Sequence, residues 1–241
     1  MALSGSSKRK DKTTILVTGA NRGLGFGLVK ALAGRGDRVL AACREPERAS
    51  ALQALPLTSG KDIAVHRMDV ADGASVAAAR ALVGDGPVHG VIANAGVIGP
   101  QRQTTLDMDF GGFLDTLAVN TVGPLRIVQA FLPNLRAAER PKILVMTSRM
   151  GSFASPGTDR AAYRVSKAAL NRMFQMLARD LEPEGIAVGL VDPGWVRTDM
   201  GGSAAELSVD ESVNGILRVF DALSVETTGR FVNHDGTEIP W

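Results

Sequence analysis

The sequence predicts a doubly wound α/β fold, with a parallel sheet of about seven strands and helices on both faces. Short β-branched, apolar runs alternate along the chain with longer helical stretches, a pattern typical of parallel sheets. A glycine-rich turn separates the first apolar run from the first helical stretch. Hydrophobic residues make up 45% of the 241 residues and charged residues 22%, which is enough apolar content for one substantial core.

Strands are expected where β-branched and apolar residues gather between turn residues. In chain order these are Thr14–Thr18, Arg38–Ala42, Ile63–Met68, Val88–Ala93, Lys142–Met146, Ile186–Val191 and Arg230–Val232. Helices are expected in the longer stretches between them, several of which stop at glycine or proline. They are Gly23–Ala33, Glu47–Leu55, Ala74–Val83, Leu106–Leu117, Ala118–Leu135, Ala161–Leu181 and Val209–Leu223.

The charge distribution sets the N-terminus apart. The chain has a formal charge of +2, and its first twelve residues contribute +3 through Lys8, Arg9, Lys10 and Lys12 against Asp11, so the remainder carries −1. We therefore expect a disordered basic leader over residues 1–12 and one domain over 13–241. A nucleic-acid partner would depend on the leader alone and is not expected. The Gly- and Ser-rich stretch Trp195–Leu207 is expected to form a mobile lid.

Composition also bears on the compartment and on metals. The single cysteine, Cys43, excludes an internal disulfide framework and is consistent with a reducing compartment. The chain lacks a secretory signal and an apolar run near the ~18 residues of a membrane span. Its three histidines are scattered, at no spacing usual for a metal site. These features predict a cytoplasmic protein with no metal and no membrane contact.

The turn after the first expected strand reads Thr18-Gly19-Ala20-Asn21-Arg22-Gly23-Leu24-Gly25. Glycines at such a turn let backbone N–H groups approach a pyrophosphate and let the next helix pack close to the strand. The phosphate then lies at a helix N-terminus, where the dipole favours an anion. This turn therefore predicts a dinucleotide site that includes Gly19, Asn21, Arg22, Gly23 and Leu24.

The only tyrosine, Tyr163, precedes Lys167 by four positions in an expected helix. Residues at this spacing share one helix face. A nearby ammonium would lower the pKa of the phenol, and a shift of ~3 units needs roughly 4 kcal/mol of interaction energy. The pair is thus a candidate proton donor and acceptor, with Lys167 expected to depress the pKa of Tyr163.

Together these motifs resemble the short-chain dehydrogenase/reductase family, in which the glycine turn has the form T-G-x-x-x-G-x-G. Further motifs of the family occur in the same order along nearly the whole chain, although Ala93 stands where the family has its first Asn. The segment Asn21–Gly25 and the ending Asp235–Trp241 look most like carbonyl-reductase and C-factor-like members. The resemblance implies a Rossmann fold and further cofactor contacts at Asp69, Val70, Asn94, Ala95, Gly96, Pro193, Gly194, Val196 and Thr198.

The resemblance also implies residue roles in a reversible hydride transfer between a nicotinamide and a carbonyl or alcohol. Tyr163 exchanges the proton, and Lys167 also holds the nicotinamide ribose. Ser148 orients the carbonyl oxygen, with Ser152 as a competing hydroxyl, and Asn120 positions a water that links Lys167 to solvent.

The residues near the second expected strand favour NADP(H) over NAD(H). An acidic residue there would bind the ribose 2′-OH and reject a 2′-phosphate. This chain has Cys43-Arg44 instead, and Arg22 lies in the glycine turn. Two guanidinium groups can flank a 2′-phosphate in charge-assisted contacts.

Other functions remain open at this point. A C-factor-type signalling protein would keep the site and act through a partner, whereas a sugar-nucleotide epimerase fits the glycine spacing and chain length badly. The family resemblance implies a homodimer or homotetramer. The substrate pocket is expected to be formed by Gly96–Gln103, Met150–Phe153 and Trp195–Leu207.

Overall fold

The computed structural model describes residues 12–241 and contains a seven-stranded sheet. Its order is β3-β2-β1-β4-β5-β6-β7, and all six pairings are parallel. The strands are β1 (Thr14–Thr18), β2 (Arg38–Cys43), β3 (Ile63–Arg67), β4 (Gly90–Ala93), β5 (Lys142–Met146), β6 (Ala187–Asp192) and β7 (Phe231–Asn233). The predicted Rossmann-type sheet is confirmed.

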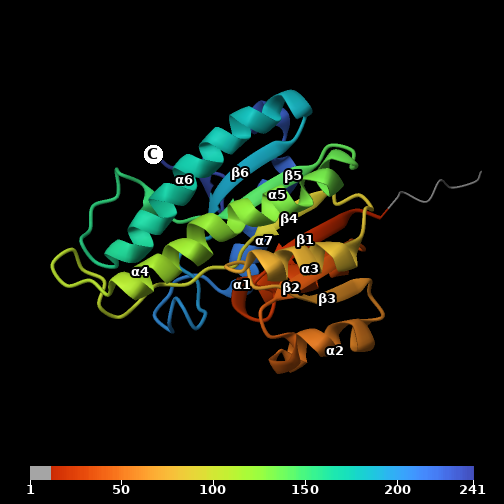
Figure 1. The fold of residues 1–241 in the computed structure, drawn as a ribbon, viewed down its shortest axis with the longest axis horizontal. Coiled ribbons are helices and arrows are strands. Elements are labelled where there is room, and N and C mark those ends of the chain that lie inside the picture. Colours follow the sequence, from red (N-terminus) through yellow and green to blue (C-terminus); the bar gives the residue numbers. More distant parts are fainter. Residues whose placement is uncertain (1–11) are drawn as a thin grey trace, which may run out of the picture.

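Helices cover both faces of the sheet (Figure 1). They are α1 (Gly23–Gly34), α2 (Ser50–Ser59), α3 (Gly73–Val83), α4 (Phe110–Leu117), α5 (Gly123–Arg136), α6 (Ala161–Leu181) and α7 (Val209–Ala222). One core lies under α3, α5 and α6 and contains Phe131 and Phe174, while the other lies under α1 and α7 and contains Leu28 and Phe220. Each such side chain contributes about 1.5–3 kcal/mol through burial.

Two helices differ from the expected bounds. The helix expected at Leu106–Leu117 begins only at Phe110, because the Asp109 carboxylate accepts the Gly112 N–H at 3.1 Å and caps it there. The segment expected at Glu47–Leu55 is divided into a 3₁₀ turn, Pro46–Arg48, and α2. Helix α2 runs on to Ser59, where Gly60 ends it in a left-handed conformation.

The continuous helix expected over Ala118–Leu135 is interrupted at its start by a π-helical turn, Ala118–Val122. Pro124 follows this turn and has no N–H, so it cannot donate the usual α-helical hydrogen bond to the Asn120 carbonyl. Turns of this kind inside a longer helix are frequent at functional sites. Here the turn contains Asn120, one of the predicted site residues.

The strand order reverses between β1 and β4. In open α/β sheets, ligands bind in the crevice at the carboxyl ends of the strands at such a reversal. The glycine turn follows β1 and the Asn94-Ala95-Gly96 segment follows β4, so the topology brings both to this crevice.

The expected basic leader, except for Lys12, lies outside the described residues. Within residues 12–241, none of the helices has both the length and the apolar composition that crossing a membrane requires.

Candidate active site

The glycine turn is packed too closely for side chains. Gly19 has a φ of +66°, and a Cβ there would lie 2.9 Å from the Ala95 Cα. A Cβ on Gly25, in the first turn of α1, would collide with the Gly19 carbonyl oxygen. The start of α1 therefore lies against the end of β1 and leaves an open cradle at a helix N-terminus, which is the arrangement that suits a pyrophosphate.

Asn94 and Thr18 hold the two central strands together at the crevice. The Asn94 amide donates to the carbonyl oxygens of Thr18, at 2.9 Å, and Gly19, at 3.3 Å. The Thr18 hydroxyl in turn accepts the backbone N–H groups of Asn94 and Ala95, both at 3.1 Å. Asn94 thus fixes the shape of the glycine turn from the neighbouring strand.

A cavity of about 590 Å³ lies beside the glycine turn and Asn94. It runs from the end of β2, past the glycine turn, to Tyr163 and Lys167 on α6. The predicted residues that line it are Gly19, Asn21, Arg22, Gly23, Leu24, Arg44, Asp69, Val70, Asn94, Ala95, Gly96, Tyr163, Lys167, Pro193 and Thr198. Four predicted residues lie outside its lining: Ser148, Asn120, Gly194 and Val196.

Tyr163 and Lys167 occupy one face of α6 at the floor of the cavity. Their side chains are largely buried, with exposed fractions of 9% and 4%. The Lys167 ammonium lies 5.7 Å from the centre of the Tyr163 ring and donates to the Met146 carbonyl at 2.8 Å. The end of β5 therefore holds the lysine beside the tyrosine.

The expected depression of the Tyr163 pKa is wrong for the protein alone. Burial, reinforced by the negative charge of Asp192, raises the pKa of the phenol to about 12, although a hydrogen bond from Ser148 acts in the opposite direction. Burial lowers the pKa of Lys167 to about 8, and Asp192 partly offsets this. Desolvation disfavours the charged form of each group and is the largest cause of both shifts.

The two candidate hydroxyls are distinguished by their partners. Ser148 comes just after β5, and its hydroxyl lies close enough to the Tyr163 phenol to lower the pKa of that group. Ser152 instead donates to the Pro240 carbonyl at 2.6 Å and accepts the Ala154 N–H. The geometry therefore favours Ser148 over Ser152 as the residue that works with Tyr163.

Asn120 is fully buried rather than on a helix surface. Its amide accepts the Val97 N–H and donates to the Val97 carbonyl, both at 2.8 Å, and it also donates to the Ser166 hydroxyl at 3.0 Å. The side chain thus ties the segment after β4 to α6. Both polar atoms of the side chain take part in these contacts.

Asp192 is a site residue that the sequence reasoning missed. It is the last residue of β6, its carboxylate is 4% exposed, and it accepts a hydrogen bond from the Arg149 guanidinium at 2.7 Å. Arg149 directly follows Ser148, so this ion pair joins the serine loop to β6. An Asp before Pro-Gly carries no local signal of such a role.

The two arginines expected near the adenosine end both line the cavity, together with Glu45 and Arg48, which were not predicted. Arg22 also forms an ion pair with Asp199 at 2.6 Å, and both side chains are mostly exposed. An exposed pair of this kind contributes only about 0–1 kcal/mol, so a phosphate can compete with Asp199 for Arg22.

The two ends of the expected lid, Trp195–Leu207, are hydrogen-bonded to each other. Backbone hydrogen bonds join Arg197 to Leu207 at 2.9 Å and Leu207 to Trp195 at 3.0 Å. The Arg197 guanidinium also donates to the Ala205 and Glu206 carbonyls.

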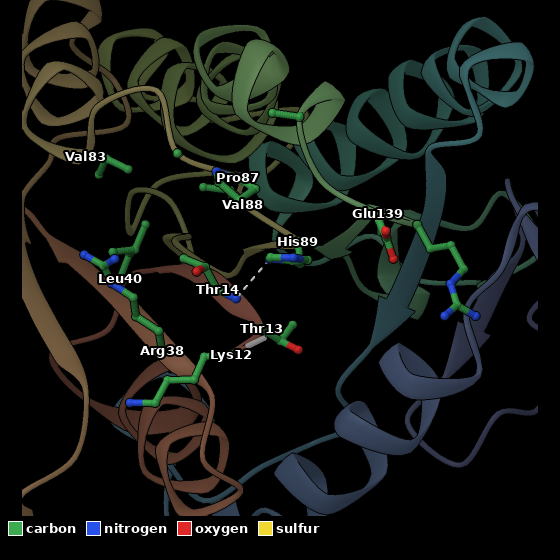
Figure 2. Close-up of a pocket in the computed structure, with 13 residues that line it drawn as sticks. Lys12, Thr13, Thr14, Arg38, Leu40, Val83, Pro87, Val88, His89 and Glu139 are labelled. Carbon is green, nitrogen blue, oxygen red and sulfur yellow. Dashed lines mark hydrogen bonds between the residues drawn. The ribbon is translucent and has the colours of Figure 1, made fainter. Parts of the chain in front are cut away.

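A second cavity, of about 690 Å³, lies at the opposite ends of the strands (Figure 2). Its lining comes from the amino ends of the strands and includes Lys12, Thr14, Arg38 and His89. Figure 2 shows the Thr14 N–H donating to the His89 ring, a bond of 3.1 Å that serves the backbone. Within residues 12–241, no cluster of His, Cys, Asp and Glu is suited to a metal ion.

Comparisons with known proteins agree with this geometry. Residues 13–207 match the family model described as short chain dehydrogenase. C-signal of Myxococcus xanthus is 47% identical over 158 residues, which are 65% of this chain and 94% of that protein. The 1-hydroxy-2-glutathionyl-2-methyl-3-butene dehydrogenase of Rhodococcus sp. (strain AD45) is 31% identical over 242 residues, 95% of this chain and 100% of that protein.

Two solved structures share the fold over most of their length. The NADPH-bound carbonyl reductase from chicken fatty liver has a TM-score of 0.88 and 34% identity, covering 95% of this chain and 99% of that one. The carbonyl reductase Sniffer of D. melanogaster has a TM-score of 0.89 and 34% identity, covering 95% of this chain and 100% of that one.

Proposed function

We propose that this chain, which belongs to the short-chain dehydrogenase family, is an NADP(H)-dependent carbonyl reductase. The observation that carries the proposal is that Tyr163 and Lys167 line the same cavity as the glycine turn, with Ser148 close to the Tyr163 phenol. The similarity to a carbonyl reductase structure with bound NADPH supports it.

The residues present fit a dinucleotide. A Cβ on Gly19 or Gly25 would collide with neighbouring protein atoms, so glycine lets the start of α1 lie against the end of β1, where a pyrophosphate would bind. Arg44 and Arg22 line the end of the cavity where NADP(H) would place its 2′-phosphate. Asp69 and Val70 line the adenine side, and Lys167 lies at the ribose end. The bound nicotinamide supplies the hydride chemistry.

The protein's own part is the handling of a proton. The pKa of Tyr163, raised to about 12 by burial, keeps the phenol protonated at neutral pH, so the phenol carries the proton that a carbonyl oxygen gaining negative charge would take up. Ser148 lies beside the same phenol and can hydrogen-bond that oxygen. Lys167, with a pKa of about 8, is mostly protonated at pH 7 and can replace the proton that Tyr163 gives up.

Asn120 is proposed as a positioning residue in this relay. Its side chain joins Val97 to Ser166 and so keeps the segment after β4 against α6. Pro124 withholds the usual donor from the Asn120 carbonyl, and this oxygen is the group that would hold a water for proton resupply.

A substrate panel tests the proposal. NADPH and NADH consumption is measured with aldehydes, ketones and quinones, for the wild type and for Tyr163→Phe. The wild type is expected to oxidise NADPH in preference to NADH, whereas Tyr163→Phe retains NADPH binding and loses turnover. Substantial turnover by Tyr163→Phe would reject Tyr163 as the proton donor.

One comparison favours a second candidate function. The similarity to a protein named C-signal supports a regulatory role in which the bound cofactor serves recognition of a partner. The same panel separates the two functions, because a protein of this second kind binds NADPH without consuming it on any carbonyl compound.

We also propose a homodimer or homotetramer formed through α4 and α6. Apolar side chains on these helices are exposed, including Phe110, Leu114, Val165 and Met176, and a second copy of this chain would cover them. Light scattering at micromolar concentration tests this, and a monomeric mass would contradict it.

A further inference from the structure

Helix α6 carries Tyr163 and Lys167, yet it begins without a cap of its own. The residue at its N-cap position, Arg160, has a φ of 53° in the left-handed region and makes no side-chain capping bond. The first N–H groups of any helix need acceptors from elsewhere. At α6 these N–H groups include that of Tyr163, so the cap bears directly on the position of the phenol.

Gln103 supplies those acceptors from 60 residues earlier in the chain. Its backbone carbonyl accepts the Ala161 N–H at 2.8 Å, and its side-chain oxygen accepts the Tyr163 N–H at 3.2 Å. Only 7% of Gln103 is exposed, so these bonds are shielded from water. One residue therefore caps the helix through both its main chain and its side chain.

The other end of the amide holds the segment that follows β4. The Gln103 side-chain nitrogen donates to the Ile98 carbonyl at 3.1 Å and to the Pro100 carbonyl at 2.7 Å. These two acceptors fix the orientation of the amide, because a flipped amide would place oxygen against two carbonyl oxygens. The amide is thus aligned with its oxygen towards Tyr163.

The segment held by Gln103 also reaches the cofactor cavity. Val97 lines that cavity and is bonded to Asn120 through both its N–H and its carbonyl. Gln103 and Asn120 therefore hold opposite ends of one short segment, and each also contacts α6, through Tyr163 and Ser166 respectively.

We propose that Gln103 is a positioning residue that fixes Tyr163 relative to the segment Val97–Gln103 at the mouth of the site. The expected loss of kcat rests on the proposed function, whereas the position of Tyr163 rests on the geometry alone. A misplacement of about 1 Å can cost on the order of 100-fold in rate. Loss of the Gln103 amide is expected to lower kcat by roughly 10- to 100-fold, with the Kd for NADPH changing less than about 3-fold because the glycine cradle is untouched.

The test compares Gln103→Met, which keeps the length of the side chain and removes its hydrogen bonds, with Asn134→Leu as the matched control. Asn134 is also a fully buried amide, which donates to the Gly84 and Gly86 carbonyls at 2.7 Å, remote from Tyr163. Each variant is measured for thermal stability, kcat, KM, hydrogen exchange at the Tyr163 amide, and ionisation of the phenol at 295 nm. Tyr163 is the only tyrosine, so the last signal reports this residue alone.

Both variants are expected to lose stability, but only Gln103→Met should lose kcat, exchange the Tyr163 amide faster and shift the phenol pKa towards its ordinary value. Gln103→Glu keeps an oxygen for the Tyr163 N–H but places its second oxygen against the Ile98 and Pro100 carbonyl oxygens, so it should lose the alignment and exchange the Tyr163 amide faster as well. The proposal is overturned if Gln103→Met matches the wild type in exchange and ionisation, or if Asn134→Leu shows the same changes. Should Gln103→Met not fold, Tyr163 exchange as slow as in the wild type in a folded Gln103→Glu variant overturns the proposal equally.

The exchange and ionisation measurements need no substrate. If the wild type reduces no carbonyl compound, the proposed function fails, and these two measurements still decide the role of Gln103.

Discussion

Raising the pH of the cofactor-free protein tests the electrostatics of the site through a single chromophore. Burial and the charge of Asp192 raise the pKa of Tyr163 from 10.0 to about 12, a difference of roughly 3 kcal/mol at about 1.4 kcal/mol per unit. At pH 11 a phenol with this pKa is about 10% ionised, whereas the same residue in the unfolded chain is about 90% ionised.

The absorbance at 295 nm measures both states, because Tyr163 is the only tyrosine in the chain. A jump to pH 11 should produce a small rapid increase in the absorbance at 295 nm from the folded protein, and unfolding in guanidinium should produce the rest of the increase. Asp192→Asn removes the second cause of the shift and should lower the pKa by part of the difference, since burial is the larger cause. A folded protein whose tyrosine titrates at or below 10 would refute this reasoning and restore the depression by Lys167.

Three further outcomes are expected. The pKa of Lys167 is lowered to about 8 in the folded protein, so between about pH 8 and 10.5 the unfolded chain binds one more proton than the folded protein does. The free energy of unfolding should therefore rise with pH in this range, by on the order of 3 kcal/mol. Lys167→Met should abolish this rise in urea titrations, and a rise that persists would contradict the assignment. Arg44→Asp should raise the Kd for NADPH by at least 10-fold and leave that for NADH within about 3-fold, whereas equal losses in calorimetry would reject Arg44 as a 2′-phosphate ligand. Gly25→Ala places a Cβ against the Gly19 carbonyl oxygen. NADPH binding should be lost, or the protein should be destabilised by several kcal/mol, because the turn is overpacked. Unchanged NADPH binding and an unchanged melting temperature would exclude a tight cradle.

Most strands were predictable because their signal is local. Runs such as Thr14–Thr18 and Lys142–Met146 are buried on both faces, so they read as continuous apolar stretches between turn residues. The helix bounds were less predictable. Phe110 rather than Leu106 begins α4, because the cap at Asp109 competes with the propensity of the residues before it.

The candidate site divides in a similar way. The glycine turn and the spacing of Tyr163 and Lys167 are visible in the sequence, and the structure places them in one cavity. The burial of Asn120, the contact of Ser148 with the phenol and the ion pair at Asp192 depend on residues far apart in the chain. Gln103 is of this second kind, since nothing near it in sequence marks it as the cap of α6.

The sequence by itself determined the order of strands and helices, the cradle at Gly19 and the pairing of a phenol with an ammonium on one helix face, because each is set by spacing along the chain. Only the tertiary structure decided the direction of the Tyr163 and Lys167 pKa shifts. Burial removes both groups from water, and the cost of desolvation depends on what packs around a side chain rather than on its neighbours in sequence.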